Sequence, residues 1–105
     1  MIYTIAHYQV KAQAVERVKK AIQEFVRYVA ANEPGTRMYA AWQQKDDPTR
    51  FVHFFMFADE TAHAAHGSSE AVKRFESVYA PELVGGKVVF TDYDFVAANA
   101  GGEIK

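Results

Sequence analysis

Hydrophobic residues along the chain follow two different spacings, which predict strands in some segments and helices in others. Residues 2–10 (IYTIAHYQV) are rich in aromatic and β-branched side chains and contain no breaker, so we expect a strand there. Residues 36–44, 50–57 and 87–96 are also predicted to be strands. The segment 45–49 has the composition and length of a hairpin turn between the second and third strands.

Apolar residues three or four positions apart predict the helices. The longest helix is expected over residues 12–31, and its apolar stripe consists of Val15, Val18, Ile22, Phe25 and Val29. Asp59 is a candidate N-cap for a short helix that extends to His66, and Ser68 or Ser69 can cap the helix that follows. The predicted order is therefore strand, helix, strand, strand, helix, helix, strand.

This order is typical of an α+β domain of the ferredoxin-like, split βαβ type, in which helices cover one face of a four-stranded sheet. The third strand, RFVHFFMF, is apolar at nearly every position. Its alternation places one set of side chains, Phe51, His53, Phe55 and Phe57, on one face and a second apolar set, Val52, Phe54 and Met56, on the other. Because the helices can cover only one face, we predict a homodimer in which the open sheet faces pack together.

The composition is that of a small globular domain. The chain has 105 residues, of which 50% are hydrophobic and 14% aromatic, and we expect a single domain over residues 1–98 followed by a tail over residues 99–105. Twelve Lys and Arg residues balance thirteen Asp and Glu residues, so the charge favours no nucleic-acid partner. The absence of Cys excludes disulfides, thiolate nucleophiles and Cys-ligated metals.

The apolar stretches are far shorter than the roughly 20 residues that a membrane span needs. The first residues also lack the basic region of a signal peptide. We therefore expect a cytoplasmic protein with no membrane partner.

Three segments resemble the antibiotic biosynthesis monooxygenase (ABM) domain family. Residues 32–39 (NEPGTRMY) are similar to the family's EPG…Y segment, residues 47–52 (DPTRFV) to its DP…F hairpin, and residues 59–69 (DETAHAAHGSS) to its D-x-x-A-x-x-x-H-x-x-[ST] helix. The resemblance implies a dimeric α+β barrel in which each protomer holds a pocket between sheet and helices. It also implies oxygenation of a phenolic, anthrone or quinol substrate with no metal or flavin cofactor.

Two departures from the family pattern change these expectations. The third strand in the family commonly ends with E-x-[WY], whereas this chain has Phe55 and Phe57 at those positions, which implies a more apolar pocket. Haem-degrading proteins of the same fold use an Asn on the first strand, a Trp at the end of the third and a His on the last helix. This chain has His7 and Phe57 at the first two places and no His over residues 76–79, so haem degradation is disfavoured.

Three side chains are candidates for acid–base catalysis. His66, the His of the resembling helix motif, can be the base that deprotonates a substrate hydroxyl, or it can hold its helix against the sheet. His7 can be a second pocket base or a hydrogen-bonded core histidine. Tyr39, which matches the family's G-x-x-x-Y position, can exchange a proton with a phenolic substrate or pack with its hydroxyl against solvent or backbone.

A second set of side chains is predicted to bind the substrate: His53, Phe51, Phe55, Phe57, Phe75 and Arg37. His53 either pairs with His7 across the sheet or fills space in the core. Arg37 either holds an anionic oxygen or pairs with Glu33.

His63 and His66 form an H-x-x-H pair on the predicted short helix, a spacing that can place two imidazoles on one side of a metal ion. No Glu lies between them in the manner of metalloproteases, and no neighbouring carboxylate is clearly aimed at them. We therefore predict no metal site.

Functions of different classes follow from this pocket. The first is a cofactor-independent monooxygenase that oxidises a small quinol-like or anthrone-like aromatic. The alternative is a non-catalytic homodimer that holds a small apolar molecule in the same pocket. In a third interpretation, the Phe-rich face is entirely core.

Overall fold

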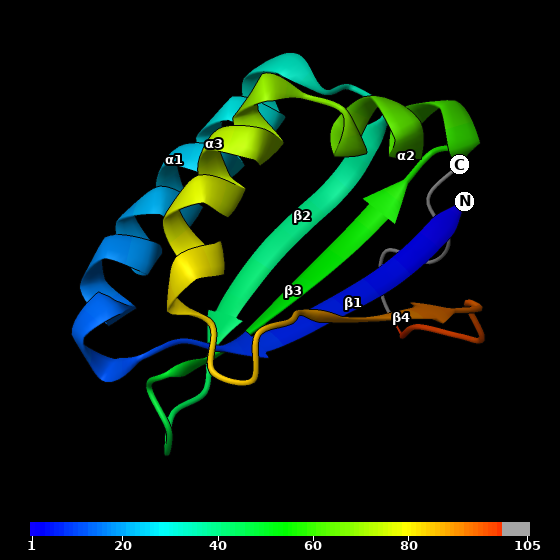
Figure 1. Cartoon of the computed structure of the whole chain (residues 1–105). Helices are drawn as coiled ribbons and strands as arrows, with labels where there is room; N and C mark the ends of the chain where they lie inside the picture. Colours follow the sequence, from blue (N-terminus) through cyan, green and yellow to red (C-terminus); the bar gives the residue numbers. More distant parts are fainter. Residues whose placement is uncertain (100–105) are drawn as a thin grey trace.

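The computed structural model describes residues 1–99, which form a four-stranded sheet with the helices on one face (Figure 1). The elements are β1 (Ile2–Gln9), a 3₁₀ turn η1 (Ala12–Ala14), α1 (Val15–Asn32), β2 (Thr36–Gln43), β3 (Arg50–Phe57), α2 (Glu60–Gly67), α3 (Glu70–Tyr79), a 3₁₀ turn η2 (Ala80–Glu82) and β4 (Val89–Tyr93). The predicted order of elements is confirmed. The predicted tail lies outside the described residues except for residue 99, and the domain boundary stays a prediction.

The sheet is antiparallel and has the strand order β2-β3-β1-β4. β3 therefore lies between β1 and β2, and Phe55 stands opposite Thr4 on one side and Tyr39 on the other. The predicted α+β, ferredoxin-like fold is confirmed. Within residues 1–99 no helix is long and apolar enough to cross a membrane.

Two side-chain caps divide the second helical region into α2 and α3. The Asp59 carboxylate accepts a hydrogen bond from the Ala62 N–H at 2.9 Å, and the Ser69 hydroxyl accepts one from the Val72 N–H at 3.0 Å. Ser69, and not Ser68, is thus the second of the predicted caps. Each cap satisfies a backbone donor that the first turn of a helix leaves free. The break between the helices brings both α2 and α3 over the sheet.

β4 is shorter than the strand predicted over residues 87–96. At one end its pairing with β1 stops at the Tyr3–Tyr93 pair, one residue from the start of β1. At the other end the Val84 N–H donates to the Gln9 carbonyl at 2.8 Å, so the preceding loop occupies the end of β1 where β4 would continue.

The two faces of β3 have different surroundings. Its odd-numbered side chains, Phe51, His53, Phe55 and Phe57, are all buried on the face that the helices cover. Facing them, α1 buries the predicted stripe of Val15, Val18, Ile22, Phe25 and Val29. Burial of these side chains is the main apolar contribution to the stability of the fold.

Among residues 1–99 no helix lies on the other face of the sheet (Figure 1). Trp42 is 56% exposed there, and Met38 on the same strand is 41% exposed. The register pairs Trp42 with Val52 and Ala40 with Phe54, so the even-numbered side chains of β3 share this face. We call it the open sheet face. It is covered in part within the chain, because Phe95 stacks on Tyr3 with the ring centroids 5.9 Å apart.

Candidate functional site

A cavity of about 260 Å³ lies between the sheet and the helices α2 and α3. We call it the central cavity. Its lining consists of Thr4, Ala6, Tyr8, Tyr39, His53, Phe55, Phe57, His63, His66, Gly67, Val72, Phe75, Glu76, Tyr79, Val88 and Phe90. Seven of these sixteen side chains are Phe or Tyr, and the lining also includes the two buried histidines, His53 and His66. This combination of apolar walls and a few convergent polar groups is typical of a small-molecule site.

Six of the nine predicted site residues line the central cavity: His66, Tyr39, His53, Phe55, Phe57 and Phe75. They come from four elements, β2, β3, α2 and α3. The fold thus brings together side chains that lie far apart in the sequence, and their roles in binding or catalysis stay predictions.

His7 does not line the central cavity, contrary to the prediction. β1 directs Thr4, Ala6 and Tyr8 toward the cavity, and the alternation of a strand turns His7 to the opposite face. The His7 side chain is exposed on the open sheet face, opposite Val52. A pairing of His7 with His53 is therefore also wrong.

Phe51 and Arg37 are not cavity residues either. Phe51 is buried behind Tyr8, on which it stacks with a centroid separation of 5.7 Å. Arg37 falls at a register shift between Thr36 and Met38, which removes it from the strand alternation, and its side chain is exposed.

His66 is held by a carboxylate. Its Nδ1 lies 2.7 Å from Glu33 Oε1, and both side chains are only 11% exposed. The Thr36 hydroxyl donates to the same Glu33 oxygen at 2.8 Å. Because a carboxylate only accepts, Nδ1 carries a proton, and in the neutral form of the imidazole Nε2 is the nitrogen that is left to accept a proton or a hydrogen bond.

The turn after α1 places Glu33 beneath α2. Glu33 follows the last residue of α1, and its carbonyl accepts from the Thr36 N–H at 3.0 Å. Gly35 allows α2 to approach this turn, since a Cβ at that position would lie 2.6 Å from the Ala62 Cβ. Only a residue without a side chain fits this contact without a shift, so the glycine of the EPG segment allows α2 to lie close to the turn that carries Glu33.

His53 is hydrogen-bonded at both ring nitrogens. Its Nε2 lies 2.8 Å from the Tyr8 hydroxyl and its Nδ1 lies 2.7 Å from the Tyr39 hydroxyl. The three side chains come from β1, β3 and β2 and form a continuous chain of hydrogen bonds on the cavity wall. His53 itself is 2% exposed.

Burial determines the charge states of this chain. It lowers the pKa of His53 to about 4, because a charged imidazole would lose its hydration there. It raises the pKa of Tyr8 and of Tyr39, and it raises the pKa of the neighbouring Tyr79 to about 12. Near neutral pH the Tyr8–His53–Tyr39 chain therefore consists of three uncharged groups.

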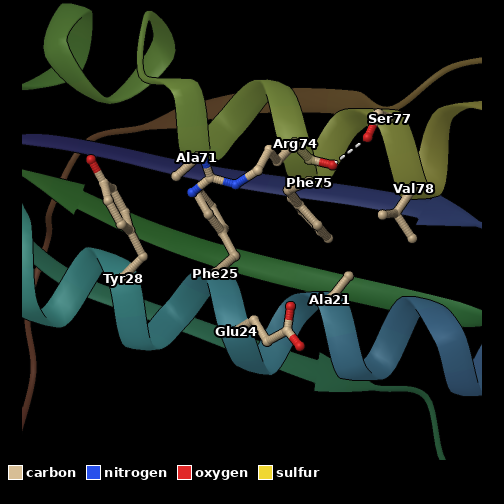
Figure 2. A pocket seen from close by; sticks show the side chains of 9 residues that line it. All are labelled: Ala21, Glu24, Phe25, Tyr28, Ala71, Arg74, Phe75, Ser77 and Val78. Carbon is tan, nitrogen blue, oxygen red and sulfur yellow. Dashed lines mark hydrogen bonds between the residues drawn. The ribbon is translucent and has the colours of Figure 1, made fainter.

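A second hollow, of about 340 Å³, lies outside the central cavity, between α1 and α3. Figure 2 shows it from close by, with Arg74 of α3 extending over the groove and Glu24 and Tyr28 on the α1 side. Phe25 and Phe75 stack at 5.1 Å beneath it, and Phe75 also lines the central cavity. One aromatic layer thus separates the two spaces. Glu24 and Arg74 are exposed, so the buried polar groups point to the central cavity as the site.

Within the described residues no group of three or more His, Asp or Glu side chains could hold a metal ion. His63 of the H-x-x-H pair is exposed at the cavity rim, where its Nδ1 lies 3.8 Å from Glu60.

The sequence profile described as antibiotic biosynthesis monooxygenase (ABM) matches residues 1–77. The chain belongs to the ABM family. No curated protein matches the sequence significantly.

Solved structures share the fold of this ABM domain. The crystal structure of an antibiotic biosynthesis monooxygenase is 23% identical with a TM-score of 0.83, over 91% of this chain and 99% of that chain. A proposed antibiotic biosynthesis monooxygenase from Caulobacter crescentus has the same identity and TM-score, over 90% of this chain and 89% of that one. One from Nitrosomonas europaea is 24% identical, with a TM-score of 0.83 and coverage of 90% and 89%. At these identities the likeness concerns the fold alone.

Sequence reasoning missed two residues of the candidate site, Glu33 and Tyr8. Glu33 belongs to the EPG segment, but its contact with His66 joins positions 33 residues apart, which no local pattern indicates. The Tyr8 side chain points to the same face of β1 as Ala6, but both faces of that strand carry apolar side chains. The alternation alone therefore did not show which face the helices cover.

We predict that His53 makes the stability of the ABM domain depend on pH. Its pKa in the native protein, about 4, lies below the ordinary value of 6.5, so only the unfolded chain takes up this proton as the pH falls through that range. The free energy of unfolding should therefore decrease between pH 6.5 and pH 4.5. The total decrease that His53 causes should be on the order of 3 kcal/mol by pH 4. Urea unfolding at several pH values measures this. His53→Gln, which has no titrating group, should show a shallower pH dependence; an equal slope would contradict the assignment.

Proposed function

We propose that this ABM domain oxygenates a small aromatic substrate, of the quinol or anthrone type, with dioxygen and without a metal or flavin. The observation that carries the proposal is the Glu33–His66 pair, in which a buried carboxylate fixes an imidazole beside an aromatic cavity. A carboxylate that accepts from Nδ1–H makes the imidazole a better base at Nε2. The site therefore offers one oriented proton acceptor among apolar walls.

The reaction begins with proton transfer to His66 Nε2 from the substrate hydroxyl or from an acidic C–H bond, whose electron pair stays on the substrate. The resulting anion passes one electron to dioxygen, and the substrate radical and superoxide combine into a C–O bond. The peroxide then takes the proton back from Nε2, and loss of water leaves a carbonyl. The substrate loses two hydrogen atoms and gains one oxygen atom, and the second oxygen leaves as water.

The other cavity residues position the ring and exclude water. Phe55, Phe57 and Phe75 provide apolar faces for an aromatic ligand. The Tyr39 ring centroid lies 5.7 Å from that of His66, so one ligand can contact both side chains. The apolar walls and a bound aromatic ring limit the access of water to the anion and the peroxide.

The alternative function is binding without chemistry. It is favoured by Phe55 and Phe57, which stand where the ABM family commonly has a carboxylate and a polar-edged ring. The cavity would then hold a small apolar molecule, and His66 and Glu33 would join α2 to the turn after α1. Consumption of dioxygen separates the two functions.

The proposal includes a homodimer through the open sheet face, as the family resemblance implies. Trp42 and Met38 leave large apolar surfaces exposed there, beside the half-buried Phe54. A second copy of the same face is a partner of matching chemistry.

We predict that the purified protein consumes dioxygen with at least one member of a panel of quinols and anthrones, faster than the substrate autoxidises. His66→Gln should slow the reaction at least tenfold, since a positioned general base contributes about 10²-fold or more. Glu33→Gln should slow it by about tenfold, because the amide orients the imidazole less well. An oxygen electrode measures the rates.

The control is His7→Gln, which changes a histidine on the opposite face of the sheet and should alter the rate by less than about twofold. A panel without any dioxygen consumption would contradict the oxygenase and favour the binding function. Equal loss in His66→Gln and His7→Gln would contradict the assignment of the base.

We predict that Trp42→Glu weakens the dimer at least tenfold, because association would bury an unpaired carboxylate from each copy. Sedimentation equilibrium should give twice the chain mass of 11.8 kDa for the wild type and a concentration-dependent average for the variant. Arg27→Glu, at an exposed position of α1, is the matched control and should leave the dimer intact. A wild type that is monomeric at micromolar concentration would contradict the proposal.

A further inference from the structure

The Tyr8–His53–Tyr39 chain has no part in the proton transfer assigned to His66. It is nevertheless the most buried polar feature of the central cavity, and all three of its side chains line that cavity. Both hydrogen bonds are short, 2.8 Å and 2.7 Å, so each ring nitrogen of His53 has one defined partner. The number of protons in this chain indicates what function these groups can have.

A neutral imidazole carries one N–H, and it can donate only one of these two hydrogen bonds. In one arrangement the Nδ1–H donates to Tyr39, Tyr8 donates to Nε2, and the Tyr39 O–H is free to point into the cavity. In the other, Tyr39 donates to Nδ1, Nε2–H donates to Tyr8, and the Tyr39 oxygen can only accept from the cavity. The heavy atoms occupy the same positions in both arrangements.

Packing keeps the ring of His53 fixed while its proton changes place. The imidazole stacks on Phe75 at 5.9 Å and meets the edge of Phe55 at 6.3 Å. The change from one proton arrangement to the other, which we call reversal, therefore requires no rotation of the ring. One proton enters the chain at one tyrosine hydroxyl and one leaves at the other, exchanged with water in the partly open cavity, and the number of protons in the chain is unchanged.

We propose that the Tyr8–His53–Tyr39 chain is a reversible hydrogen-bond switch, through which Tyr39 donates to a carbonyl or accepts from an O–H or N–H of a bound aromatic ligand. The inference rests on the proposed function in that the same cavity is the ligand site. It extends that function, because such a switch can bind both the hydroxyl of a substrate and the carbonyl of its product. Tyr39 is the contact to the ligand, since it is half-buried whereas Tyr8 is buried.

Tyr8 and His53 are positioning residues in this scheme. Their uncharged state supports it, because burial lowers the pKa of His53 to about 4 and raises the pKa of both tyrosines. Neither arrangement then leaves a charge in the cavity, and a hydrogen bond between a ligand and Tyr39 favours one arrangement over the other.

Two bicyclic probes of similar size test the switch by ¹⁵N NMR of the histidine side chains in the full-length protein. 1-Indanone can only accept a hydrogen bond through its carbonyl, and indole can only donate one through its N–H. We expect His53 to adopt the Nδ1–H tautomer with saturating 1-indanone and the Nε2–H tautomer with saturating indole. The same tautomer with both probes, or no response of His53 to either, would overturn the inference.

Tyr8→Phe and Tyr79→Phe form a matched pair of variants, since each removes one hydroxyl from the lining of the same cavity. Tyr8→Phe should lock the Nδ1–H tautomer with both probes, because the other tautomer leaves a buried N–H without a partner. It should also weaken indole relative to 1-indanone at least fivefold, whereas Tyr79→Phe should keep the reversal. Reversal that persists in Tyr8→Phe would overturn the inference.

Neither probe is a quinol or an anthrone, so the result does not depend on turnover. Tautomer reversal without any dioxygen consumption would support the switch and contradict the oxygenase. Dioxygen consumption without tautomer reversal would support the oxygenase and contradict the switch.

Discussion

The architecture of the site depends on the burial of one imidazole in the middle of an aromatic sheet. His53 stands on the central strand β3, where an unpaired polar group would cost about 1–3 kcal/mol. Tyr8 from β1 and Tyr39 from β2 satisfy its two nitrogens from opposite sides. This requirement joins three strands in one register, and it brings two tyrosine hydroxyls to the wall of the central cavity.

Many aromatic residues of the chain belong to one of three groups, which are the core, the wall of the central cavity and the open sheet face. Phe25 and Phe51 are core, and Phe75 belongs both to the core and to the cavity wall. Phe55 and Phe57 line the cavity from the sheet, while Trp42 and Phe54 lie on the open sheet face. A strand that is apolar on both faces thus serves two different neighbours, the helices on one side and, as we propose, a second copy on the other.

Much of this fold could be predicted from local patterns. The stripe of α1, the Asp59 cap and the alternation of β3 all depend on residues close in sequence, and each was predicted correctly. The face of β1 that the helices cover was not predicted correctly, because both faces are apolar and the register of β1 with β3 is a long-range property. For that reason His7 was a candidate and Tyr8 was not. The Glu33–His66 contact joins positions 33 residues apart and needed the tertiary structure.

The most direct test of the central cavity as a ligand site is a crystal structure of the protein soaked with 1-naphthol. We predict electron density for the naphthalene ring between Phe55 and Phe75, with the naphthol oxygen within hydrogen-bonding distance of the Tyr39 hydroxyl or His66 Nε2. Density for the probe only in the groove between α1 and α3, or a central cavity filled by rearranged side chains at saturating 1-naphthol, would contradict the account.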